Sequence, residues 1–154
     1  MRTYFAIFSI LIIFLMGSCQ PSPHFEKHIR FKNANWNKFT ELNYEIPVEI
    51  GKSYTFAGKI LTDSNYTRRK LGIGFYLYLP SGEKRLDDQE IRIRDFEYKA
   101  LGEKDQNMYI LPVIFRKNLS IDEAGNLKLI ITQNSQFVDN FGIIGLDLTV
   151  TEDK

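Results

Sequence analysis

The sequence predicts an all-β protein, a single-domain antiparallel β-sandwich of about seven or eight strands, jelly-roll or immunoglobulin-like in its layers. Short segments alternate apolar and polar residues with a period of two, and turns rich in Gly, Pro and Asn separate them. No segment carries a helical stripe of apolar residues. A chain of 154 residues is long enough for one sizeable core, and it favours one domain.

The first two strands are expected over residues 40–50 and 54–61, on either side of a turn at Gly51. Pro47 has no N–H to donate to a neighbouring strand, so the strand over 40–50 lies at a sheet edge or carries a bulge. Trp36 precedes this strand in an Asn-rich turn, and we expect its side chain to close the edge of the core.

The strongest strand pattern covers residues 71–79, where every second residue is a large apolar one. A turn follows, and a hairpin is expected to return over 83–87. Residues 63–70 and 99–107 are expected to be loops. The remaining strands are predicted over 90–97, 108–115, 127–132 and 143–150, with a short piece at 119–121. Of these, 108–115 is apolar on both faces and is expected to be central.

The N-terminal residues have the pattern of a bacterial lipoprotein signal. Arg2 precedes an apolar run over residues 5–16, small residues follow it, and then comes the single cysteine, Cys19. The run is too short for a membrane span, which needs about 20 residues, but it fits the apolar core of a signal peptide, about 7–15 residues. We therefore expect cleavage before Cys19 and lipidation of that cysteine with fatty acyl chains such as palmitate. Two or more chains would make the membrane anchor stable.

This interpretation divides the chain into a signal peptide (1–18), a lipidated cysteine with its tether (19–35) and the β-sandwich domain (36–154). The tether begins with two prolines within residues 20–23, which favour a stiff, extended backbone. The residues after Cys19 are not acidic. Surface-displayed lipoproteins of some bacteria often carry acidic residues there, so a domain that faces the periplasm is favoured. We expect the anchor to lie in the outer membrane.

Composition excludes several functions. Lys and Arg total 20 against 19 Asp and Glu, which argues against nucleic-acid binding. No nucleophile, phosphate-loop or metalloprotease motif is present, so we expect a non-enzymatic protein with no catalytic residue and no cofactor. His24 and His28 lie four residues apart but lack further ligands, so no metal site is expected. The acidic pairs at 87–88 and 122–123 are expected at turns.

Tyr76 and Tyr78 are the candidate ligand-binding residues. They project from the same face of one strand, beside Gly72 and Gly74, and such a surface can stack on sugar rings or contact a partner. The alternative is that the strand is central and that both tyrosines line a second packed face. Basic residues are a further candidate.

Those basic residues are Arg92 and Arg94 on one strand and residues 68–70 in a loop. The two arginines can hold an anion or form a solvated strand face paired with Asp87, Asp88 or Glu90. The loop can contact anionic lipid head groups or serve only as a soluble loop tip.

Several stretches resemble the gliding-motility lipoprotein family GldH. They are Asn35-Trp36, residues 61–66, and a C-terminal series formed by 124–133, 137–140 and 143–146. Their order and spacing carry the resemblance, which covers most of residues 19–154. One departure is Ala124-Gly125, where the family often has a Pro–Gly pair.

The resemblance implies an envelope lipoprotein that serves the gliding machinery and works alongside a dedicated outer-membrane secretion system. It implies envelope proteins as partners and supplies no catalytic or ligand residues. The first hypothesis is therefore a membrane-anchored protein that acts by protein–protein contact. The second is a surface or periplasmic glycan-binding module that uses Tyr76 and Tyr78.

Overall fold

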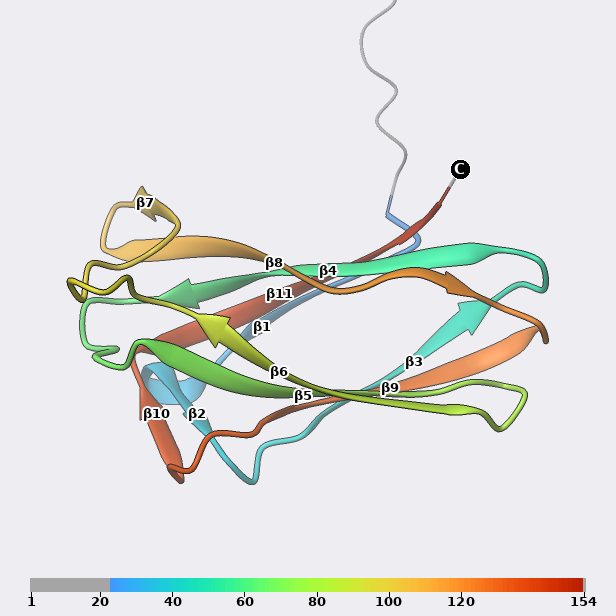
Figure 1. Ribbon diagram of the computed structural model, residues 1–154, viewed down its shortest axis with the longest axis horizontal. Helices are drawn as coiled ribbons and strands as arrows, with labels where there is room; N and C mark the ends of the chain where they lie inside the picture. Colours follow the sequence, from blue (N-terminus) through green and yellow to red (C-terminus); the bar gives the residue numbers. More distant parts are fainter. Residues whose placement is uncertain (1–22, 154) are drawn as a thin grey trace, which may run out of the picture.

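Two antiparallel β-sheets face each other in the computed structural model, which describes residues 23–153 (Figure 1). The first sheet has the strand order β1-β11-β4-β8-β7 and the second has the order β3-β9-β5-β6. A separate pair, β10 and β2, lies at one end. The first sheet contains β1 (Phe25–Arg30), β4 (Ser53–Thr62), β7 (Glu103–Asp105), β8 (Met108–Ser120) and β11 (Ile143–Glu152). The second contains β3 (Leu42–Val48), β5 (Lys70–Tyr78), β6 (Lys84–Arg92) and β9 (Gly125–Gln133). The small pair is β2 (Asn35–Asn37) with β10 (Asp139–Phe141), and β2 follows a single 3₁₀ turn, η1 (Lys32–Ala34).

The strand order identifies a jelly roll. When the short strands β2, β7 and β10 are set aside and the other eight are counted in chain order, the sheets read 1-8-3-6 and 2-7-4-5. Each sheet thus combines strands from both halves of the chain, as in the double Greek key of that architecture. The predicted all-β sandwich is confirmed, and of its two forms the strand order selects the jelly roll.

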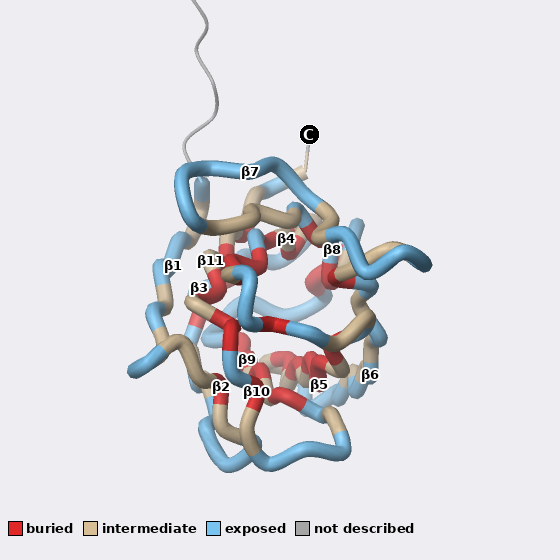
Figure 2. Tube along the Cα trace, turned by 90° about the vertical axis from the view of Figure 1, so that its left-hand side faces the viewer, coloured by how far each residue is buried: buried red, intermediate tan, exposed pale blue. Residues whose placement is uncertain are grey.

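The core lies between the sheets, and buried residues alternate with less buried ones along strands such as β5 and β9 (Figure 2). Phe75 of β5 lies at its centre, edge-on to Phe56 at 5.7 Å between ring centroids and stacked on Phe115 at 5.0 Å. Phe56 and Phe115 belong to the first sheet and Phe75 to the second, so these rings join the two layers.

Side chains also close both open sides of the sandwich. On one side Phe25 of β1 meets Tyr44 of β3 edge-on, with ring centroids 5.8 Å apart. On the other side Gln89 of β6 donates a hydrogen bond of 2.6 Å to the carbonyl of Phe115 in β8. These contacts cover exposed strand edges, which would otherwise be sites for pairing with another chain.

Five expected strands are present in the structure. They are β3 (expected over 40–50), β4 (54–61), β5 (71–79), β9 (127–132) and β11 (143–150). As expected for a strand with an internal proline, β3 lies at a sheet edge, where Pro47 faces solvent. Trp36 is fully buried, as expected.

The tether was predicted over 19–35, but residues 25–30 form β1, which pairs with β11 from Phe25 opposite Val150 to Arg30 opposite Gly145. The apolar pattern does not reveal this strand because Lys27 occupies an inward position between Phe25 and Ile29. At the open side of the sandwich its long side chain reaches outward and lies 5.7 Å from the Phe25 ring.

Three further expectations need correction. The strands expected over 83–87 and 90–97 are replaced by one strand, β6, which spans Lys84–Arg92, pairs with β5 along its full length and ends before residues 93–97. An edge strand of this kind accepts polar residues on both faces, so its apolar pattern is broken. The loop predicted at 99–107 contains β7, which pairs with the start of β8. Finally, β8 is central only at that start, because β7 covers no residue beyond Ile110.

Candidate functional site

One end of the sandwich, which we call the aromatic end, is formed by the segments 31–41, 63–69, 93–107 and 134–142 (left in Figure 1). Most of the exposed large hydrophobic residues lie there. They are Phe39, Phe96, Tyr98, Phe137, Val138 and Phe141, whereas Ile50, Leu86 and Ile114 lie elsewhere. Exposed apolar side chains gathered in this way are typical of protein-interaction surfaces.

A buried polar network holds the segment 134–142 in place. The Gln133 side chain is 2% exposed, donates to the carbonyl of Phe137 at 2.8 Å and accepts the Ser135 N–H at 2.8 Å. Asn140 is fully buried, donates to the Ser135 hydroxyl at 2.9 Å and accepts from Arg68 at 2.9 Å. Because each buried amide has partners, the loop carries its exposed apolar side chains on a fixed backbone.

The β2–β10 pair extends this network. Asn35 and Asn37 both donate to the same Asp139 oxygen, at 2.8 and 2.9 Å, and these bonds hold the pKa of the Asp139 carboxyl below its ordinary value. Between the two asparagines in sequence, Trp36 points inward and stacks on Phe31 with ring centroids 4.8 Å apart. The pair therefore forms a cap over the end of the core.

Two glycines allow the backbone to pack closely at this end. Gly142 has φ +89°, and a Cβ at this position would overlap the backbone of Tyr66. A Cβ at Gly145 would overlap the carbonyl oxygen of Ile29 in β1. Burial raises the pKa of Tyr66 to about 12, and its hydroxyl donates to the Lys70 carbonyl at 2.7 Å.

The stretches that carry the resemblance to GldH proteins meet in this structure at the aromatic end. Asn35-Trp36, residues 61–66, the residues after Gln133, and Gly145 all contribute to its packing or its polar network. Sequence reasoning included Phe137 and Val138 in one of these stretches but did not single out the exposed aromatic residues as a surface. Phe96 was expected to point inward from the strand predicted over 90–97, whereas it is exposed.

Tyr76 and Tyr78 lie on the outer face of the second sheet. Their strand is central, between β9 and β6, as expected. No second layer covers this face within residues 23–153, so the packed-face alternative is wrong. Tyr76 lies over Gly74 and donates to Asp88 at 2.8 Å, and burial, with that hydrogen bond, raises the pKa of Tyr76. Both tyrosines are half-buried by their neighbours.

The acidic residues on β6 and the arginine after it have other contacts than the sequence predicted. Asp87 and Asp88 lie within β6 rather than in a turn, and Asp87 pairs with Arg116 at 3.3 Å. Arg94 is largely structural: its side chain donates to the carbonyls of Tyr66 at 2.5 Å, Tyr98 at 2.7 Å and Ser64 at 3.2 Å. The expected ion pairs of Arg92 and Arg94 do not form among the described residues.

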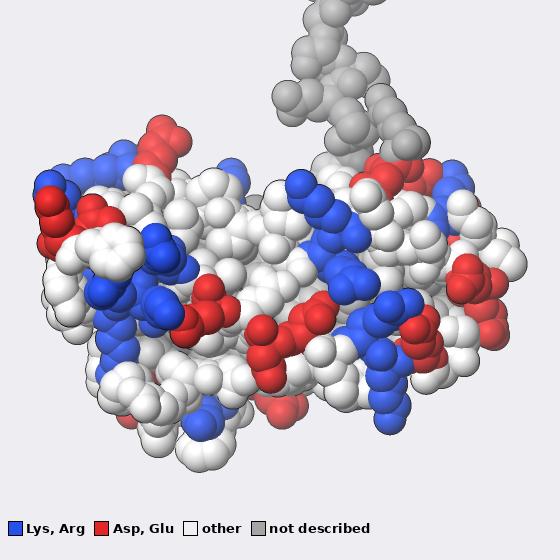
Figure 3. Space-filling model, viewed as in Figure 1, with Lys and Arg blue, Asp and Glu red and all other residues white. Residues whose placement is uncertain are grey.

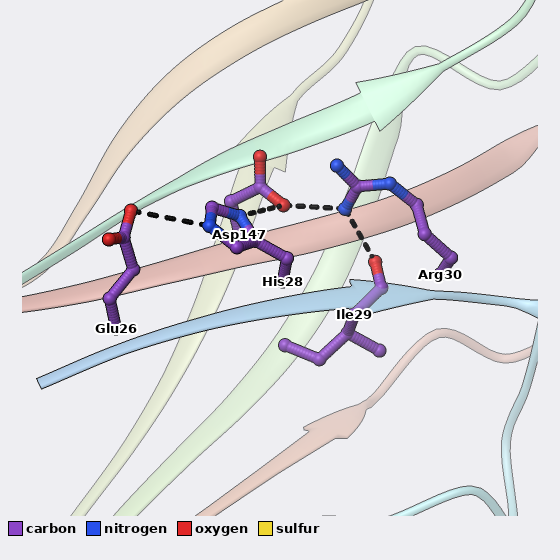
Figure 4. Close-up of polar contacts among 5 residues, drawn as sticks. All are labelled: Glu26, His28, Ile29, Arg30 and Asp147. Carbon is purple, nitrogen blue, oxygen red and sulfur yellow. Dashed lines mark hydrogen bonds and ion pairs between the residues drawn. The ribbon is translucent and has the colours of Figure 1, made fainter.

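His28 and Arg30 flank Asp147 on the outer face of the first sheet (Figure 4). His28 Nδ1 lies 3.1 Å and Arg30 Nη1 2.5 Å from the same Asp147 oxygen. Burial raises the pKa of Asp147, but the hydrogen bonds and charges of Arg30 and His28 outweigh it and lower the pKa below its ordinary value. These contacts fasten β1 to β11.

Within residues 23–153 no group of three or more His, Cys, Asp and Glu side chains is placed to hold a metal ion. No helix there has the length and apolarity to cross a bilayer. The lipidation site predicted at Cys19 lies outside the described residues.

Comparisons with known proteins give one family. A family model described as GldH lipoprotein matches residues 23–142. Among curated proteins none matches this sequence.

Solved structures that resemble this chain remotely include infectious bursal disease virus proteins. The VP2 subviral particle aligns at 9% identity and TM-score 0.31, covering 82% of this chain and 29% of that one. The structure of the Gt strain aligns at 10% identity and TM-score 0.33, covering 84% and 30%. This chain thus spans about a third or less of those proteins, and such TM-scores carry no conclusion.

The family match covers most of the described residues, including every segment of the aromatic end. The chain therefore belongs to the GldH lipoprotein family.

Proposed function

We propose that this lipoprotein is anchored to the cell envelope through Cys19 and acts, without catalysis, by protein–protein contact within the gliding-motility machinery and its associated secretion system. Family membership supports the envelope lipoprotein, and the outer membrane with a periplasm-facing domain is the location we favour. The observation that carries the contact function is the aromatic end, where exposed apolar side chains stand on a rigid polar network.

The geometry of that end suits a docking surface better than a reaction site. Its buried polar groups bond to one another and to backbone carbonyls. The exposed apolar residues are spread over separate segments, so a partner can contact several of them at once.

Site-specific photo-crosslinking in native membranes tests this proposal. A photoreactive residue replaces Phe39, which is 80% exposed at the aromatic end, and a matched control replaces Ile50, which is 66% exposed at the opposite end. We expect crosslinks to an envelope protein from position 39 and few from position 50. Equal crosslinking at both positions, or none at either, would contradict the proposal.

The physiological role needs a second readout. Deletion of the gene is expected to reduce surface spreading and export by the secretion system, and the wild-type gene is expected to restore both. Unchanged spreading and export after deletion would contradict the motility role, but not the proposal that the protein is anchored and acts by protein–protein contact.

A glycan-binding module is the second candidate, because one specific feature favours it. Tyr76 lies on an open sheet face directly between Leu86 on β6 and Ile130 on β9, with Tyr78 two residues further along β5. Aromatic rings with apolar neighbours can stack on sugars. A glycan array tests this candidate, and binding that survives Tyr76→Ala with Tyr78→Ala would exclude the named site.

A further inference from the structure

Four arginines in the aromatic end or directly beside it have no carboxylate partner among residues 23–153. They are Arg68, Arg69, Arg92 and Arg94, whereas Arg30, Arg85 and Arg116 each form an ion pair elsewhere. Basic side chains gather at this end in Figure 3, with acidic side chains near them. Because guanidinium groups stay charged at any physiological pH, the four arginines carry positive charge that no carboxylate within residues 23–153 compensates by direct contact.

Five nearby carboxylates have other partners. Asp63, Asp95 and Asp139 accept hydrogen bonds from their own or a neighbouring segment. Glu90 pairs with Lys70, and Glu97 pairs with Lys99 at 2.6 Å. These five carboxylates are used locally, and no carboxylate contacts the four arginines within residues 23–153.

Two of the four arginines, Arg69 and Arg92, also donate no side-chain hydrogen bond within the described residues. Arg68 donates to Asn140, and Arg94 donates to three backbone carbonyls. For Arg69 and Arg92 no acceptor lies within reach in the described chain, and the Nε of Arg69 is buried without one. The guanidinium N–H groups of Arg92 and the Nη groups of Arg69 therefore have no partner within the described residues.

An exposed phenylalanine positions these two side chains. The Arg69 guanidinium lies 4.3 Å and the Arg92 guanidinium 5.1 Å from the centroid of the Phe96 ring. Phe96 itself is 71% exposed. Cation–π contact with the ring restrains both side chains before any ligand arrives, which reduces the entropy lost on binding. Bringing two like charges to one ring also favours a ligand that carries negative charge.

We propose that Arg69 and Arg92, held at Phe96, bind an acidic segment of a protein partner through two carboxylates. Guanidinium groups bind carboxylates through paired, charge-assisted hydrogen bonds. Both guanidiniums lie within 5.1 Å of the centroid of one ring, so two acidic side chains about 7 Å apart, as on alternate residues of an extended strand, can reach both of them. This inference rests on the proposed contact function and names the chemistry of the partner.

A protein segment suits the site better than the lipid surface that Cys19 would enter. The chain enters the first sheet at Phe25, opposite Val150, while the aromatic end lies at the other end of β11, near Ile143. These points are seven residues apart along the strand, about 23 Å. The predicted tether before residue 24 is shorter than this, so an anchor there favours a membrane near the opposite end.

Peptide binding to the purified mature lipoprotein in neutral phosphatidylcholine proteoliposomes tests the proposal. The probe is a fluorescent peptide of alternating Glu and Ser, and the control peptide has Gln in place of Glu. We expect the Glu peptide to bind and the Gln peptide not to bind, with affinity falling as salt is added. Arg69→Gln with Arg92→Gln should weaken binding by about tenfold or more, since two charge-assisted contacts are lost.

The matched control is Lys117→Gln with Lys128→Gln, which removes the same charge from exposed positions on β8 and β9. It should bind as the wild type does. Unchanged emission from Trp36 checks the fold of every variant, and the single variant at exposed Arg92 provides a second test if the double variant is unstable.

Failure of the Glu peptide to bind, or equal binding by the double variant, would overturn the proposal. A second set of proteoliposomes contains added phosphatidylglycerol. If anionic lipid displaces the peptide from the wild type, the arginines bind phosphate head groups and the acidic-segment assignment is wrong. Crosslinking at position 39 does not depend on these arginines, so a failed peptide test with positive crosslinks leaves the contact function standing.

Discussion

Replacing Gly145 with alanine is expected to detach β1 from the sheet. Gly145 lies in β11 opposite Arg30, and a Cβ at this position would overlap the carbonyl oxygen of Ile29 and lie 3.0 Å from the Arg30 side chain. The nearest atom belongs to the backbone, so no rotation of a side chain relieves the overlap. Either β1 or β11 must move.

The expected cost follows from the contacts that such a movement breaks. Separation at this point removes about two backbone hydrogen bonds between β1 and β11, at about 1 kcal/mol each. It also loosens the contacts of His28 and Arg30 with Asp147 and exposes part of Ile29. Together these losses reduce the free energy of unfolding by about 2–4 kcal/mol, a large effect for a single methyl group.

Urea unfolding of the mature lipoprotein in detergent, followed by the fluorescence of Trp36, measures this change. Trp36 is the single tryptophan and is fully buried, so its emission reports loss of the core. The matched control is Gly82→Ala. Gly82 has φ +86° with open space around it, so only backbone strain of about 1 kcal/mol is expected.

Amide exchange gives the local signature. Residues 25–30 should exchange faster in Gly145→Ala than in the wild type, while β5 and β9 remain protected. A loss of stability no larger than that of Gly82→Ala, or unchanged exchange over 25–30, would refute the reasoning.

Three further predictions concern the anchor and two titrating groups. Cys19→Ala should release a folded domain from the membrane, and retention of this variant in the membrane fraction would exclude the anchor. Asp147→Asn should destabilise the domain by about 1–2 kcal/mol near neutral pH through loss of the Arg30 contact. Since the folded pKa of Asp147 is lowered, the stabilisation that its carboxylate provides is fully present above pH 3.8 and is lost as the pH falls through the folded pKa. The free energies of unfolding of the variant and the wild type, measured by urea titration, should therefore converge below the folded pKa. For Tyr66 the folded pKa of about 12 exceeds the ordinary 10.0, so stability should fall as pH rises from 10 to 12, and Tyr66→Phe should reduce this fall in urea titrations.

The alternation of apolar residues was enough to predict the sandwich, because strands such as β5 bury every second side chain against the opposite sheet. The pattern failed where a strand lies at an open side of the sandwich. β1 carries Lys27 at an inward position, and β6 carries Asp87 and Gln89 there, because long polar side chains at such sides reach solvent or the other sheet. Periodicity reports burial, so it does not detect strands that are only partly buried.

The candidate sites were predicted less completely, and for a different reason. Tyr76 and Tyr78 were placed on one strand face correctly, but which face is covered depends on the other sheet. The contact of Arg69 with Phe96 joins residues from two loops, and their meeting depends on how β5 pairs with β6. Local sequence carries no signal for such a meeting.

The topology explains why docking residues gather at one end. Four connections between the sheets pass through the aromatic end, over 31–41, 63–69, 93–107 and 134–142, and only two pass through the opposite end. Connecting segments tolerate changes in sequence better than the strands they join. Exposed residues such as Phe96 and Arg92 can therefore be replaced, to suit a different partner, at little cost in stability, whereas Gly145 cannot. Binding and folding should accordingly be separable: variants at Arg69 and Arg92 should lose the acidic ligand with near wild-type unfolding, and Gly145→Ala should lose stability first.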